Sequence, residues 1–230
     1  MKKNSMMRLA SFLMIAVLLS TSVVGSTFAK YVTAETGSDT ARVAKFGVEI
    51  TANGEMFSDK YVNVDGGNIA GDANLTVEAA EKAVAPGTTG DLVAMTIAGT
   101  PEVSVEVKYE ATLTLEGWEA DLTDDDVVET AYYCPLEITV GSQTFKGLDY
   151  ANEADPVAAF KADVEEAINA YTDEYAPNQP MANVGAPVVS WVWEFEGNND
   201  YADTYLGDQA AEGNAATITL EITTTVTQLD

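Results

Sequence analysis

The feature that most constrains the fold is a long run of alternating residues, "VSVEVKYEATLTLEGW", from Val103 to Trp118. Apolar side chains stand at every second position: Val103, Val105, Val107, Tyr109, Ala111, Leu113 and Leu115. Charged or hydroxyl-bearing side chains stand between them: Ser104, Glu106, Lys108, Glu110, Thr112, Thr114 and Glu116. Successive side chains of a strand point to opposite faces, so this pattern predicts a β-strand with one buried and one wet face, as antiparallel sheets provide. We expect a strand this long to bend or to change sheets partway.

Shorter stretches of the same kind follow along the chain. We expect strands at Val43–Thr51, Tyr61–Val64, Leu75–Ala79, Leu92–Ala98, Leu136–Val140 with a turn at Gly141-Ser142, Val188–Phe195 and Thr217–Val226. Val189, Trp191, Trp193 and Phe195 share one face, and these large side chains are expected to anchor the core. About eight strands separated by Gly, Pro, Asn and Asp predict an all-β, antiparallel β-sandwich.

One segment departs from the period of two. In "DPVAAFKADVEEAINAYTDEY" Asp155 is a good N-cap and Pro156 suits the first helical position. Apolar residues then recur at intervals of three and four, at Val157, Phe160, Val164, Ala167, Ile168, Tyr171 and Tyr175. This predicts one amphipathic helix over about 156–175, inserted at 155–176 into a single sandwich domain of residues 45–230.

The N-terminus reads as a secretory leader, residues 1–29. A basic stretch, "MKKNSMMR", precedes an apolar one, and "STFA" places Thr27 and Ala29 where a signal peptidase expects small residues. We expect cleavage between Ala29 and Lys30, with Ala34 as the second choice. The mature chain is then secreted, to the extracellular matrix or the cell surface, with no membrane span.

The net charge of the chain excludes some classes of binding partner. The 230 residues carry 11 basic and 37 acidic side chains, a net charge of −26. Loss of Lys2, Lys3 and Arg8 with the leader leaves eight basic side chains against 37 acidic ones, a net charge of −29. Such a chain repels nucleic acid and anionic membranes, and its self-association is expected to respond to salt, divalent cations and pH.

The residue inventory argues against an enzyme. The chain has no histidine, which excludes histidine-dependent triads and histidine-ligated metal sites, and no glycine-rich loop has the form of a phosphate cradle. Acidic pairs are expected by chance among so many carboxylates. The single cysteine, Cys134, is expected to be a small buried residue. We therefore expect no catalytic residues and no bound cofactor.

Two acidic stretches could hold a structural calcium ion. They are "DLTDDD", with Asp121, Asp124, Asp125 and Asp126, and "EGNNDYADTYLGD", with Asn198, Asn199, Asp200, Asp203 and Asp208. Calcium takes six to eight oxygen ligands, and loops of this composition can supply them. Neither stretch matches the helix–loop–helix calcium pattern, and solvated turns are the alternative interpretation.

Several stretches together resemble a known family. The leader runs through "GSTFAKYVT" to "FGVEIT", and "VAPGTTGDLVAMTIAGTPEVSVEVKYEATL" follows. This order is similar to that of the TasA/camelysin family, the exported biofilm-matrix fibre proteins of Gram-positive bacteria. In that family a dedicated signal peptidase trims a leader ending in a Gly-Thr-Trp-Ala-like sequence. Ser26, Thr27, Phe28 and Ala29 hold the matching places here.

The resemblance implies a jelly-roll-like sandwich that polymerises. In such fibres the N-terminal segment of one subunit adds as a strand to the sheet edge of the next. Residues 30–44 would be this donor strand, with self-assembly residues Tyr31, Val32, Ala34, Ala41 and Val43. The partners would then be other copies of the chain, the signal peptidase, and cell-wall or matrix components.

Two alternatives stay open from the residues themselves. The segment 30–44 contains Gly37 and Asp39, which are poor strand formers, and it fits a plain linker or an intramolecular edge strand equally well. The chain could also be a monomeric cell-surface binding module, recognising carbohydrate or acting as a calcium-dependent adhesin. An exposed Trp118 beside other aromatic residues would favour carbohydrate binding.

Overall fold

The structure is a computed structural model that describes residues 42–51, 56–62, 76–79, 81–92, 96–123, 129–182, 187–195 and 198–229. The chain separates into two compact units, Met1–Val43 and Ala44–Asp230, and every element below belongs to the second. The predicted leader and Lys30–Ala41 therefore lie outside the described residues. No helix in the described part of the chain is long and apolar enough to cross a membrane.

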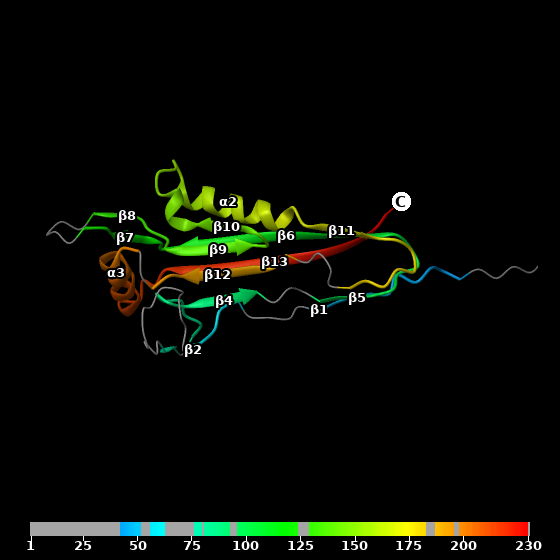
Figure 1. Cartoon of the computed structure of the whole chain (residues 1–230), viewed down its shortest axis with the longest axis horizontal. Coiled ribbons are helices and arrows are strands. Elements are labelled where there is room, and N and C mark those ends of the chain that lie inside the picture. Colours follow the sequence, from blue (N-terminus) through cyan, green and yellow to red (C-terminus); the bar gives the residue numbers. More distant parts are fainter. Residues whose placement is uncertain are drawn as a thin grey trace, which may run out of the picture. The chain divides into compact units, whose positions relative to one another are not determined.

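The second unit consists mainly of antiparallel strands with two α-helices, as Figure 1 shows. The elements are β1 (Val48–Thr51), β2 (Lys60–Val62), β3 (Thr76–Glu78), β4 (Thr89–Leu92), β5 (Thr96–Gly99), β6 (Val105–Glu116), β7 (Glu119–Asp121), β8 (Thr130–Tyr132), β9 (Leu136–Val140), β10 (Gln143–Lys146), the 3₁₀ turn η1 (Gly147–Tyr150), α2 (Pro156–Asn169), β11 (Thr172–Tyr175), β12 (Val189–Trp193), α3 (Asp200–Ala211) and β13 (Thr217–Gln228). The expected all-β architecture is confirmed, with a second helix that the sequence did not lead us to expect.

Two sheets carry the core. One has the order β10-β9-β12-β4 and the other β11-β6-β13, and two-stranded pairs β1-β5, β2-β3 and β7-β8 complete the fold. Strand β6 pairs with β13 over all 12 of its residues, from Val105 opposite Gln228 to Glu116 opposite Thr217. The expectation that this strand changes sheets is wrong. The jelly-roll connectivity implied by the resemblance stays a prediction.

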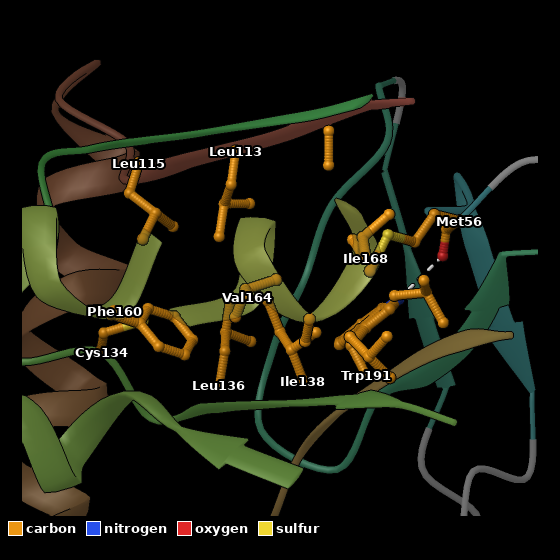
Figure 2. Close-up of a cluster of buried hydrophobic side chains, with 14 of the residues drawn as sticks. Met56, Leu113, Leu115, Cys134, Leu136, Ile138, Phe160, Val164, Ile168 and Trp191 are labelled. Carbon is orange, nitrogen blue, oxygen red and sulfur yellow. Dashed lines mark hydrogen bonds between the residues drawn. The ribbon is translucent and has the colours of Figure 1, made fainter. Parts of the chain in front are cut away.

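The core lies between these sheets, with α2 along one side. Figure 2 shows Leu113 and Leu115 of β6 pointing toward Leu136 and Ile138 of β9, with side chains of α2 beside them. Leu113, Leu136 and Ile138 are fully buried. Each such side chain contributes about 1.5–3 kcal/mol on burial, so these alternating strands stabilise the fold through their buried faces.

The tryptophan prediction for β12 is also confirmed. Trp191 and Trp193 are 1% and 4% exposed, and the indole nitrogen of Trp191 donates to the Met56 carbonyl at 2.8 Å. Gly90 of β4 lies directly opposite Trp191, and a Cβ there would collide with this indole and with the Met56 carbonyl. The glycine is therefore required by the close approach of a large ring, which the sequence pattern did not indicate. Phe195, the last residue of the predicted face, is 39% exposed.

Helix α2 begins as predicted and ends six residues early. The Asp155 side chain accepts from the backbone N–H of Ala158 at 3.0 Å, and Pro156 is the first helical residue. The helix ends at Asn169, and Thr172–Tyr175 form β11, which pairs with Lys108–Val105 of β6. Tyr175 is buried, as the predicted helix also required. Its position in the sequence fits the helical spacing by chance, and this coincidence made the predicted helix too long.

Of two other strand predictions, the hairpin around Gly141 is confirmed and the strand Leu92–Ala98 is wrong. The hairpin of β9 and β10 turns at Gly141-Ser142 as expected, with Gly141 at a φ of 60° that favours glycine. The single strand expected at Leu92–Ala98 is wrong. Leu92 ends β4, which pairs with β12, whereas Thr96 begins β5, which pairs with β1.

Cys134 is a buried core residue, as expected. It is fully enclosed, and burial raises the pKa of its thiol to about 12. A thiol held protonated in this way is a poor nucleophile.

Candidate functional site

Strand β13 is the longest sheet edge in the described part of the chain. In the order β11-β6-β13 its strand partner is β6, on one side. The other edge strands of the two main sheets, β4, β10 and β11, are four residues long. A long edge strand is a template onto which a further strand can add, and proteins usually cover or shorten such edges.

The inward face of β13 is only half covered. Leu113 and Leu115 of β6 are 0% and 7% exposed, whereas their cross-strand partners Leu220 and Ile218 are only half-buried. Ile222 and Val226 continue the same half-buried face along β13. Since paired residues of one sheet face share one side, this difference shows that the cover of the core thins from β6 to β13. The apolar residues of β13 pack against the core but stay partly exposed in the described part of the chain.

A groove of about 710 Å³ lies beside the first part of this face, from Thr217 to Leu220. Apolar groups of β13, α3 and the segment around β4 form most of its walls: Ile218, Leu220, Leu206, Gly207, Ala210, Met56, Phe57, Val84 and Leu92. Three charged side chains, Glu81, Lys82 and Asp203, also line it. The size and the apolar lining suit an extended peptide with small or medium apolar side chains.

Trp118 closes one end of the site and is buried. It is 2% exposed, its indole nitrogen donates to the Thr217 carbonyl at 2.8 Å, and its ring lies 5.8 Å from that of Trp193. The bond to Thr217 fixes the start of β13. An exposed Trp118 would have favoured carbohydrate binding, and that feature is contradicted.

The second acidic stretch folds as helix α3 instead of a loop. Asn199 caps the helix by accepting from the backbone N–H groups of Tyr201 and Ala202 at 3.1 and 3.3 Å. Ala202 and Leu206, four residues apart, are its buried residues. A capping Asn followed by this spacing is a helix signal that was present in the sequence.

Asp203 forms a hydrogen bond that links helix α3 to the segment after β8. The Tyr133 hydroxyl donates to its Oδ1 at 2.7 Å. Burial raises the pKa of Asp203 above its ordinary value, and the nearby charge of Asp200 acts in the same direction, while the bond from Tyr133 opposes them. The same burial and the bond to Asp203 raise the pKa of Tyr133. This pair ties α3 to the segment that follows β8.

The calcium prediction gains no support from these residues. Asp200, Asp203 and Asp208 lie on α3, whereas Asp124 and Asp126 lie outside the described residues. Over the described ranges no three acidic, cysteine or histidine side chains are grouped so that they could hold a metal ion. Calcium binding therefore stays a prediction.

The self-assembly residues are only partly within the structure. Tyr31, Val32, Ala34 and Ala41 lie outside the described residues, as does the cleavage site at Ala29 and Lys30. Val43 is described and is 91% exposed. The groove along β13 was missed by sequence reasoning because the alternation in "TITLEITTTV" identifies an apolar face but not how much of it is covered.

Comparisons with known proteins returned nothing similar: no family model, no curated protein and no solved structure matches this chain.

Proposed function

We propose that this chain is a secreted structural protein, a subunit of an extracellular biofilm-matrix fibre. Residues 30–44 of one copy add as a strand to β13 of the next copy and fill the groove beside it. The resemblance to the TasA/camelysin family motivates this proposal, and the half-covered face of β13 is the observation that carries it.

The acceptor site has both components that strand addition needs. Among the described strands β13 pairs with β6 alone, so its other side is where we propose that a strand adds, and the groove beside Ile218 and Leu220 offers an apolar lining for alternate side chains. The donor segment supplies Tyr31, Val32, Ala34, Ala41 and Val43. Burying such residues against Ile218 and Leu220 would stabilise the contact by roughly 25 cal/mol per Å² of apolar surface removed from water.

The groove and the N-terminal end of the second unit lie at different ends of β6, which favours a filament. The Lys45 carbonyl accepts from the Glu102 backbone N–H at 2.9 Å, so Lys45, the residue that follows the proposed donor segment, lies near the start of β6. The groove lies at the opposite end of β6, beside Trp118 and Thr217. A contact between two different ends of a molecule is heterologous, and such contacts repeat without closing unless the rotation forms a ring.

Filling the groove tests this proposal. Gly207 lies in α3, lines the groove and has open space around the position of a Cβ. Gly207→Trp should occupy the groove and abolish filaments of protein that starts at Lys30. Thr204→Trp places the same ring at an exposed position of α3 outside the groove and should leave filaments intact.

Thermal unfolding of both variants must first show that they are folded. Electron microscopy then gives the readout. Filaments from Gly207→Trp that match those of the unchanged chain would contradict the proposed acceptor site.

A further inference from the structure

On the second edge of β6, the strands that the structure describes cover only part of its length. On the side away from β13, β11 pairs with residues Val105 to Lys108 of β6. The backbone N–H groups of Ala111 and Leu113 lie further along the strand. Since these residues are two apart, both N–H groups point to the same edge, where an added strand could accept from them.

Two side chains of helix α2 take the place of that strand. The Asn169 Oδ1 accepts from the backbone N–H of Ala111 at 2.7 Å, and the Glu165 Oε1 accepts from that of Leu113 at 2.7 Å. Four residues of a helix rise about 6.0 Å, and two residues of a strand rise about 6.6 Å. The spacing of Glu165 and Asn169 therefore matches the spacing of the two N–H groups.

The helix is held in this position by its buried face. Phe160, Val164 and Ile168, spaced by four residues, are fully buried and point into the core, as Figure 2 shows. The two accepting side chains lie beside this face, at the border of the core. The apolar stripe thus sets the distance between α2 and β6, and the oxygens of Glu165 and Asn169 satisfy the backbone there.

We infer that Glu165 and Asn169 are edge-blocking residues, which stop a second chain from adding a strand to β6. This inference rests on the proposed function in one respect: it explains why assembly would use β13 alone and give unbranched filaments. Native proteins commonly protect sheet edges by covering them or by placing charged groups on them. Here a carboxylate and an amide do so by direct hydrogen bonds to the strand.

The test removes both acceptors and follows the two amides. In mature protein kept monomeric at low ionic strength, Glu165→Ala with Asn169→Ala should speed hydrogen exchange at Ala111 and Leu113 at least tenfold. The same variant should form dimers in sedimentation velocity at a salt concentration at which the unchanged protein is still monomeric. Glu166→Ala removes the same charge from an exposed neighbour on α2 and should change neither readout.

A conservative pair of substitutions tests whether an accepting oxygen at each position is sufficient. Glu165→Gln with Asn169→Asp keeps an accepting oxygen at each position and should retain slow exchange and the monomeric state. Amides of β12 must stay protected in every variant, which shows that the fold is intact.

Unchanged exchange, or faster exchange without dimers, would overturn the blocking role. Neither readout requires filaments. A wild-type chain that never polymerises would contradict the proposed function, but the edge-blocking role could still be tested in this way.

Discussion

Asp203 is a residue at which burial and hydrogen bonding act on the pKa in opposite directions. Its carboxylate accepts from Tyr133, but burial still raises its pKa above the ordinary value. Between its unfolded and its raised folded pKa, the native state binds more protons than the unfolded state. Asp203 therefore contributes most to stability in acid, and this contribution is lost as the pH rises through the folded pKa.

Asp203→Asn tests this residue. Asparagine keeps an oxygen that can accept from Tyr133 but cannot ionise. Relative to the wild type, the variant should gain stability as the pH rises from about 4 to 7, because only the wild type must bury a charge. Thermal unfolding across this range gives the measurement, with Asp208→Asn as the control for charge on the same helix. A stability difference that is constant with pH would refute the assignment.

At the scale of elements, the N-cap side chain of α3 makes more hydrogen bonds than that of α2. Asn199 accepts from two backbone N–H groups of α3, and its Nδ2 donates to the Leu122 carbonyl at 3.0 Å. One side chain thus starts the helix and ties it to the end of β7. Since α3 forms one wall of the groove, loss of this cap should also loosen the proposed acceptor site.

Asn199→Ala should lower the free energy of unfolding by about 1–2 kcal/mol, the upper part of the range for lost caps. Chemical denaturation followed by circular dichroism measures this change. Asp155→Ala removes the N-cap of α2 and should cost about 1 kcal/mol, since Asp155 accepts from one backbone N–H group, that of Ala158. A smaller loss for Asn199→Ala than for Asp155→Ala would show that the Leu122 bond adds nothing.

The sequence predicted elements best where local pattern and tertiary environment agree. Alternation gave β6 and the β9–β10 hairpin, and Asp155-Pro156 gave the start of α2. The end of α2 could not be placed, because Thr172–Tyr175 become a strand only through pairing with β6. The helix α3 was missed because its acidic residues were interpreted as a loop.

The site was harder to predict than the elements that form it. Alternation predicted the strand Thr217–Val226, which carries Ile218, Leu220, Ile222 and Val226 on one face. Their half-burial depends on where α3, β4 and Met56 come to lie, which are contacts between residues far apart in the chain. Likewise, Glu165 and Asn169 look like ordinary polar residues of an amphipathic helix until β6 is placed beside them.

At the scale of the whole molecule, charge should control assembly. The whole chain carries a net charge of −26, removal of the predicted leader would make it −29, and copies with such a charge repel one another; the sequence isoelectric point is about 4.1. Salt shortens the range of this repulsion to about 3 Å at 1 M, and acid removes the charge itself.

The monomer fraction of the mature chain should therefore fall as salt is added at pH 7, or as the pH falls toward 4.1. Light scattering at fixed protein concentration measures it. Gly207→Trp, which blocks the proposed groove, separates specific assembly from simple precipitation, because only precipitation should persist in it. A monomer fraction that stays equal across both series would count against assembly limited by charge.

The measurement that tests the central claim most directly is electron microscopy of two purified proteins, one starting at Lys30 and one at Val43, at several pH values. If residues 30–44 are the strand that joins copies through β13, the longer protein forms filaments and the shorter one stays monomeric. Filaments from both proteins would show that the contact between copies does not need residues 30–42. Filaments from neither would contradict the claim and leave a monomeric β-sandwich module, for which glycan binding would be the next activity to test.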